Sequence, residues 1–147
     1  MTEWRIEVGA EKNGTPAALL EDLTDAIRWT LRQEEVGEIE LSVALMADDS
    51  IAALNEKYLS HQGPTDVISF PLERPGAGRV GDIYIGVDEA ERQAAEHGVT
   101  VREELIRLVI HGTLHVLGWE HPADDERDGT PMYQRQEQLL RSFLDRS

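Results

Sequence analysis

The chain has 147 residues, of which 40% are hydrophobic and 29% charged, and it carries a formal net charge of −15 at pH 7. These values predict one soluble globular domain over residues 1–147 and no membrane partner, because no apolar run approaches the roughly 20 residues that cross a bilayer. The absence of cysteine excludes disulfides, thiolate catalysis and cysteine-ligated zinc, and we expect a cytoplasmic location. The acidic charge repels nucleic acid in general, so we expect no DNA partner.

The first half of the chain predicts two strands and two helices. Alternating apolar and polar residues predict strands over residues 4–8 and 38–45. Between them we expect a helix that begins at Pro16, with Thr15 as its N-cap, and runs to about Glu35. The second helix is expected after residue 47, with its N-cap and core-facing residues among Asp48, Asp49, Ile51, Leu54 and Tyr58.

The second half predicts two more strands and three more helices. We expect a turn-rich loop over residues 61–65, a strand over 66–70 ended by Pro71, a loop over 73–79 and a strand over 81–87. The expected helix signals that follow are Asp88 and Gly98 around one helix, Thr100 before the next, and Pro131 at the start of the last, after an acidic loop over 122–129. The packing residues of the last helix are predicted to be Met132, Leu139, Leu140, Phe143 and Leu144.

These elements do not alternate regularly between strand and helix. We therefore expect an α+β fold, with a small mixed sheet of about four strands covered by helices. A candidate metal site lies on a central helix and its exit loop.

Three of the five histidines, His111, His115 and His121, define that candidate site. A spacing of four places the first two imidazoles one turn apart on one helical face. Gly118 is expected to end the helix, because glycine takes a positive φ without steric cost, and the chain then bends to bring His121 to the same point. Three converging neutral imidazoles predict an open metal site that activates water. The alternative is a hydrogen-bonded histidine cluster without metal.

The donor set favours one Zn²⁺ ion, and Ni²⁺ or Cu²⁺ could bind in vitro because imidazole binds them well. For RNA cleavage such a metal could activate water or polarise a phosphoryl oxygen, and the residues leave both routes open. The remaining histidines, His61 and His97, are expected to be solvated.

The histidine spacing also matches a peptidase pattern, His-Glu-x-x-His-x-x-Gly-x-x-His. Every histidine and the glycine agree, but the glutamate position is occupied by Gly112. That glutamate is the general base of the protease chemistry, so its absence disfavours a peptidase.

Residues 111–121, His-Gly-Thr-Leu-His-Val-Leu-Gly-Trp-Glu-His, resemble the signature of the YbeY family of endoribonucleases. Three further blocks are similar to the family in the same order, namely Leu54–Tyr58, Pro64–Pro71 and Gly81–Ile85. The resemblance covers about residues 38–140 and rests on all four blocks together.

The resemblance implies a zinc-dependent, single-strand-specific endoribonuclease acting in 3′-end maturation of small-subunit ribosomal RNA and in ribosome quality control. It implies His111, His115 and His121 as metal ligands, and it assigns no catalytic side chain here. The implied partner is ribosomal RNA or a ribosomal particle, with a ribosomal protein or a GTPase as a further partner. A non-catalytic, ribosome-associated module remains the alternative, with Glu120, Asp124 or Asp125 closing the metal site.

Some positions depart from the family pattern. Many members carry an arginine where this chain has Leu59, so phosphate binding could shift to Arg74 or Arg79, or His61 could compensate. Two milder departures are a glutamate in place of aspartate and a glycine in place of serine, at Glu120 and Gly86.

Several charged residues near these blocks could act as bases or orienting groups. For Asp66 we favour a turn cap, for Asp82 a strand-end residue, and for Glu120 either role is open. Arg107 could orient a phosphate, but we expect it to pair with Glu103 or Glu104 on its own helix.

Overall fold

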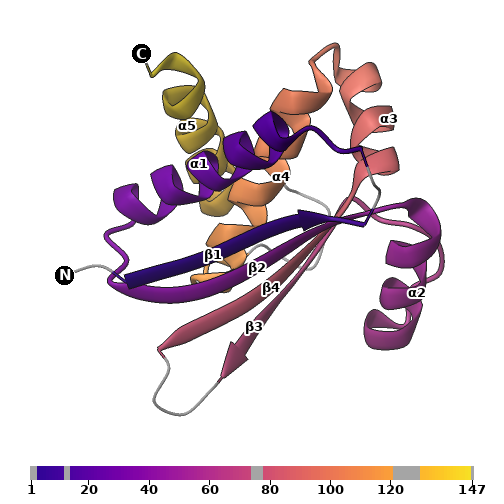
Figure 1. Cartoon of the computed structure of the whole chain (residues 1–147), viewed down its shortest axis with the longest axis horizontal. Coiled ribbons are helices and arrows are strands. Elements are labelled where there is room, and N and C mark those ends of the chain that lie inside the picture. Colours follow the sequence, from indigo (N-terminus) through magenta and orange to yellow (C-terminus); the bar gives the residue numbers. More distant parts are fainter. Residues whose placement is uncertain (1–2, 12–13, 74–77, 121–129, 147) are drawn as a thin grey trace.

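The computed structural model describes residues 3–11, 14–73, 78–120 and 130–146. These residues build one four-stranded sheet with the order β1-β2-β4-β3 (Figure 1). The sheet pairs β1 (Glu3–Ala10), β2 (Glu38–Met46) and β4 (Arg79–Gly86) in parallel, whereas β3 (Val67–Glu73) lies antiparallel to β4 at the edge. The fold is therefore α+β with a mixed four-stranded sheet, as the sequence predicts.

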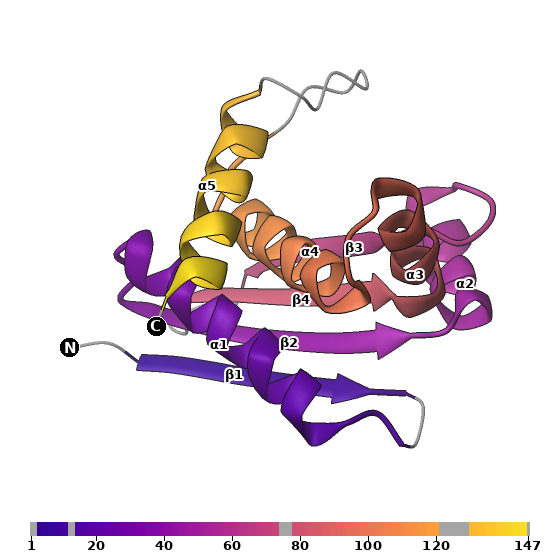
Figure 2. The same ribbon diagram turned by 90° about the horizontal axis from the view of Figure 1, so that it is seen from above.

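The helices α1 (Ala17–Gln33), α4 (Val101–Val116) and α5 (Pro131–Asp145) cover one face of this sheet (Figure 2). Two further helices, α2 (Asp48–Leu59) and α3 (Val87–His97), lie at the end of the sheet where β2 and β4 finish. The core fills the space between the sheet and α1, α4 and α5, and α4 supplies seven of its buried apolar side chains: Leu105, Ile106, Leu108, Val109, Ile110, Leu114 and Val116. No helix among the described residues is both long enough and apolar enough to pass through a membrane.

Two glycines let α4 lie unusually close to β4. A Cβ added at Gly81 would lie 2.5 Å from Cγ1 and 2.6 Å from Cγ2 of Val116. A Cβ added at Gly112 would lie 2.9 Å from Cγ2 of Ile83. Because real Cβ atoms do not approach so closely, these two contacts fix the height of α4 above the sheet.

The helix ends show which sequence signals were interpreted correctly. Thr100 and Thr130 cap α4 and α5, and their hydroxyls accept hydrogen bonds from the backbone N–H groups three residues later. Gly98 and Gly118 adopt positive φ values of 66° and 103° after α3 and α4, as predicted.

Other cap assignments were wrong. Pro16, and not Thr15, occupies the cap position of α1, because the carbonyl of Pro16 accepts the first helical hydrogen bonds. Asp48 and Asp88 lie in the first turns of α2 and α3 instead of capping them. The carboxylate of Asp88 accepts a hydrogen bond from the backbone N–H of Asp48 at 2.9 Å, so α3 caps α2 from a distance.

Two further expectations on the sheet were also wrong. Strand β3 continues through Pro71 to Glu73, which an edge strand permits because an edge residue needs no inward N–H donor. Tyr58 does not face the core, since its side chain is 55% exposed and its ring lies edge-on against Phe70 on the uncovered face of the sheet.

Candidate active site

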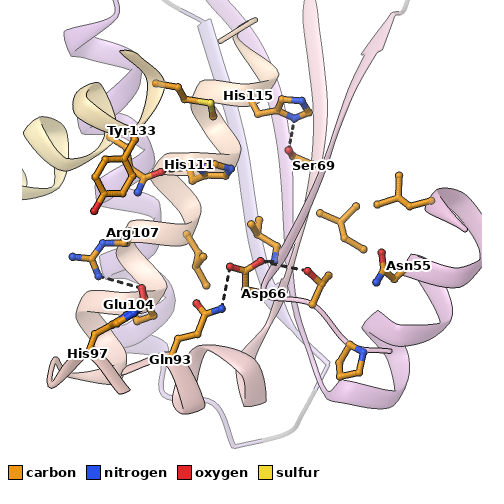
Figure 3. Close-up of a pocket in the computed structure, with 18 of the residues that line it drawn as sticks. Asn55, Asp66, Ser69, Gln93, His97, Glu104, Arg107, His111, His115 and Tyr133 are labelled. Atoms are coloured by element: carbon orange, nitrogen blue, oxygen red, sulfur yellow. Dashed lines mark hydrogen bonds and ion pairs between the residues drawn. The ribbon is translucent and has the colours of Figure 1, made fainter. Parts of the chain in front are cut away.

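A cleft of about 1080 Å³ separates α4 from β3 and the loop that precedes β3. Helix α4 forms one wall, and α5 extends that wall with Thr130, Met132, Tyr133 and Gln136. The opposite wall consists of β3 and the segment from Leu59 to Asp66, and α3 contributes Gln93 and His97 (Figure 3).

His111 and His115 both line this cleft from α4, one helical turn apart. Nδ1 of His111 donates a hydrogen bond to Oε1 of Gln136 on α5 at 2.7 Å. Nδ1 of His115 is hydrogen-bonded to Oγ of Ser69 on β3 (Figure 3). Each ring is therefore held by its Nδ1 atom from a different neighbouring element, which leaves Nε2 as the nitrogen that would coordinate a metal.

The third predicted ligand, His121, lies outside the described residues, together with Asp124, Asp125 and the rest of the acidic loop. Among the residues that the structure does describe, no group of three His, Asp or Glu side chains is arranged to hold a metal ion. The donor chemistry of His111 and His115 nevertheless fits a zinc site, since both imidazoles are oriented by oxygen acceptors as metal-binding histidines usually are.

Ser69 and Gln136 were not identified as site residues from the sequence. Ser69 lies inside one of the family-like blocks, but a serine in a strand carries no signal of its own. Gln136 is 5% exposed and lies fifteen residues beyond the histidine motif on a separate helix. Only the packing of α5 against α4 brings it to His111.

The carboxylates singled out from the sequence do not act as bases here. Oδ1 of Asp66 accepts a hydrogen bond from the backbone N–H of Val67 at 2.7 Å, and Oδ2 accepts one from Gln93 at 3.2 Å, so its role is to cap and position β3. Glu120 is exposed and does not line the cleft.

Asp82 lies within β4 and not at its end, which corrects the prediction. The neighbouring Gly81 and Ile83 face α4, so alternation along the strand directs Asp82 to the opposite, uncovered face. There, burial raises the pKa of Tyr84, and the Asp82 carboxylate raises it further.

Arg107 forms the predicted ion pairs with Glu103 and Glu104, and adds Glu137 on α5 at 2.9 Å. Burial pulls the pKa of the guanidinium down, but hydrogen bonds from Glu137 and Glu104 outweigh it and raise the pKa above its usual value. Burial likewise acts to raise the pKa of Glu137, but hydrogen bonds from Arg107 and Gln136 hold it below the ordinary value. Arg107 is thus committed to three carboxylates and is no phosphate ligand.

The position of the family arginine, Leu59, lines the cleft with a side chain 43% exposed, next to His61. Arg79 does not replace that arginine, since its Nη1 donates to the carbonyl of Leu117 at 2.7 Å, outside the cleft. Arg74 lies outside the described residues. His61 is therefore the one family-arginine substitute considered above that the structure places in the cleft.

Gly86 has a structural reason that concerns the same wall. Its backbone N–H donates to the carbonyl of Asp66 at 2.8 Å, and an added Cβ would lie 2.2 Å from the carbonyl oxygen of Thr65. A serine at this position would push the loop before β3 outward, so in this chain the loop lies closer to the sheet than a serine would allow.

The chain was compared with known protein families and proteins. The sequence profile of the family described as Endoribonuclease YbeY matches residues 5–144. Endoribonuclease YbeY from Geobacillus thermodenitrificans is 36% identical over 95% of this chain and 96% of its own length. Endoribonuclease YbeY from Bacillus subtilis is 31% identical over 94% of each chain.

Solved structures support the same assignment. The solution structure of TM1509 from Thermotoga maritima is 30% identical and superimposes with a TM-score of 0.66, covering 94% of this chain and 88% of the other. A match over nearly the whole sequence, together with an agreeing fold and the paired histidines of α4, leads to one conclusion: this chain belongs to the YbeY family of endoribonucleases.

Proposed function

We propose that this chain is a metal-dependent endoribonuclease that cleaves single-stranded RNA during 3′-end maturation of small-subunit ribosomal RNA and in ribosome quality control. The observation that carries the proposal is the oriented pair His111 and His115 in the cleft of a chain that belongs to this family. His121 is the proposed third ligand of one Zn²⁺ ion, and Ni²⁺ is a substitute in vitro.

The chain's own residues would prepare the cleft for this chemistry. Gln136 and Ser69 hold Nδ1 of the two histidines, which fixes the ring tautomer and aims Nε2 at one point. The contacts of Gly81 and Gly112 with Val116 and Ile83 keep α4 at a constant height, so the imidazoles are presented from a rigid support. When bound, the metal ion would supply a Lewis acid for activating water or polarising a phosphoryl oxygen.

The charge of the chain bears on how RNA reaches this cleft. At −15 the isolated protein attracts free RNA weakly, because phosphate contacts dominate RNA affinity. We therefore propose that the substrate is presented by a ribosomal particle, with a ribosomal protein or a GTPase as the partner that supplies positive charge.

Two observations disfavour the alternatives. The position of the peptidase glutamate, Gly112, faces Ile83 in the core, so a glutamate there would point away from the cleft. A closed, non-catalytic metal site would need a further ligand, and Glu120 is exposed and outside the cleft.

The test is a cleavage assay on the metal-loaded chain with single-stranded RNA, the same RNA annealed to its complement, an rRNA-precursor fragment and casein. We expect cleavage of the unpaired RNAs only, and loss of cleavage after chelation and in His115→Ala. Glu120→Gln is the matched control and should keep full activity. Cleavage that persists in His115→Ala, or cleavage of casein, would overturn the proposal. If the free RNAs are not cut, immature small subunits should be cut by wild type and spared by His115→Ala, and failure there too would refute it.

A further inference from the structure

The cleft extends beyond the histidines to an inner end at Glu104. Glu104 lies seven residues before His111 on α4, a rise of about 10 Å at 1.5 Å per residue. A single nucleotide bridges such a separation between its phosphate and the edge of its base. The two ends of the cleft therefore suit two parts of one RNA segment.

Glu104 has an unsatisfied acceptor at this inner end. The residue is only 2% exposed, and Oε1 accepts a hydrogen bond from Nη1 of Arg107 at 3.1 Å. Oε2 is buried and accepts no hydrogen bond from any described residue. Its charged neighbour is Nδ1 of His97, at 3.9 Å, which is too far for a hydrogen bond (Figure 3). A buried carboxylate oxygen without a donor is costly and indicates a place for one.

The charges around Glu104 determine what that donor is. Arg107 is shared by three carboxylates, those of Glu103, Glu104 and Glu137, so this end of the cleft carries an excess of negative charge. Asp66 adds a fourth carboxylate to the cleft lining. A phosphate would be repelled here, whereas a neutral group rich in N–H donors would be attracted.

We propose that the inner end of the cleft binds the amino edge of a nucleobase, with Oε2 of Glu104 accepting a hydrogen bond from the exocyclic amino group. This inference rests on the proposed function, since it assigns the recognition step to the same cleft. Cytosine and adenine present such an amino group, and a glutamate acceptor is a recognised partner for it. Uracil and hypoxanthine present a carbonyl oxygen at the same position, which faces the carboxylate and leaves it unpaired.

His97 is the cover of this subsite. It is the last residue of α3, directly before Gly98, and its side chain is 62% exposed. The ring therefore swings away from Oε2 at little cost in buried contacts, and an entering base takes its place.

The experiment is an NMR titration of the isotope-labelled, metal-free full-length chain with matched nucleosides. Cytidine is compared with uridine, and adenosine with inosine, because each pair differs in the exocyclic amino group and the adjoining ring nitrogen. We expect cytidine and adenosine to bind at least about tenfold more tightly than their partners, with shifts at Gln93, His97 and Glu104.

Two variants separate recognition from a structural role. In Glu104→Gln, Arg107 retains the amide oxygen and the amide NH₂ replaces Oε2, so the preference should invert toward uridine and inosine. Glu103→Gln is the matched control, because Glu103 also contacts Arg107 but does not line the cleft, and its preference should equal that of the wild type. His97→Ala should bind the amino nucleosides at least as tightly as the wild type.

Equal affinities within each pair, or a preference that Glu104→Gln leaves unchanged, would overturn the inference. The outcome is independent of turnover, since the titration needs neither metal nor cleavage. Discrimination without RNA cleavage would sink the proposed function and keep the subsite. Cleavage without discrimination would do the reverse.

Discussion

Replacing Gly81 by alanine tests how the sheet positions the two histidines of α4. The added Cβ would lie 2.5 and 2.6 Å from the two γ-carbons of Val116, whereas ordinary contacts are 3.4–4 Å. Val116 is 5% exposed and its β-branched side chain has little rotamer freedom in a helix, so α4 must move away from β4 by about 1 Å. Overpacking of this kind costs about 1–3 kcal/mol. For a chain of this size, the melting temperature should fall by about 2–4 °C for each kcal/mol.

The same movement should impair the site more than the fold. Ser69 belongs to the sheet and His115 to α4, so lifting α4 breaks their hydrogen bond. Gln136 and His111 both lie on helices, and their hydrogen bond is expected to survive. Misplacement by 1 Å costs on the order of 100-fold in rate, so RNA cleavage should fall well beyond what the stability loss explains.

The assay combines urea unfolding with the cleavage rate, both measured at a temperature where every variant is folded. Gly9→Ala is the control, because it adds the same methyl group to the same sheet at a position with nothing within 4 Å. Val116→Ala removes both γ-carbons and leaves its own Cβ at 3.1 Å as the nearest atom, so the double variant should be more stable than the sum of the single effects predicts. If Gly81→Ala unfolds and cleaves like Gly9→Ala, or if the two single effects simply add, then the glycine contact does not set the height of α4.

Gln136→Leu should weaken Zn²⁺ binding about 10- to 100-fold in a competition titration, whereas Gln138→Leu on the exposed side of α5 should leave the affinity unchanged; equal affinities would contradict an orienting role. Glu137 has a folded-state pKa below its ordinary 4.5, so the unfolded state binds more protons, and the stability that its pairing with Arg107 confers is present above pH 4.5 and lost as the pH falls through the folded value. Urea unfolding between pH 3 and 7 should thus show Glu137→Gln less stable than wild type at pH 7 and equal to it near pH 3; a constant difference would refute this. Gly112→Glu should lower the melting temperature and create no activity on casein, and any gain of peptidase activity would show that this position reaches the cleft.

The sequence predicted what depends on local pattern. The α+β class, the long helix that carries His111 and His115, the threonine caps of α4 and α5 and the glycine after α4 all follow from periodicity and from side-chain chemistry within a few residues. The pairing of Arg107 with Glu103 and Glu104 was confirmed for the same reason, because three- and four-residue spacings are fixed by the helix itself.

What escaped prediction depends on contacts between distant segments. Gln136 and Ser69 reach the histidines only because α5 and β3 pack on either side of α4, and nothing near either residue in the sequence signals this. Asp88 was expected to cap its own helix, yet it caps α2, forty residues earlier in the chain. Pro71 was expected to end a strand because the sequence does not reveal that β3 lies at the sheet edge, where a missing N–H does no harm.

The long-range cap of α2 gives the two walls of the cleft different stiffness. The α4 wall is seated on the sheet by buried carbon contacts, which ionic strength does not weaken. Helix α2, which leads into the other wall, is tied to α3 by the Asp88 cap and by the ion pair of Arg92 with Asp48, whose side chains are 48% and 35% exposed. Dissolved ions screen such a pair, so amide protons of α2 should exchange faster as salt is added while those of α4 stay protected. A polymer that threads between the walls therefore meets one unyielding side and one compliant side whose slack the surrounding electrolyte adjusts.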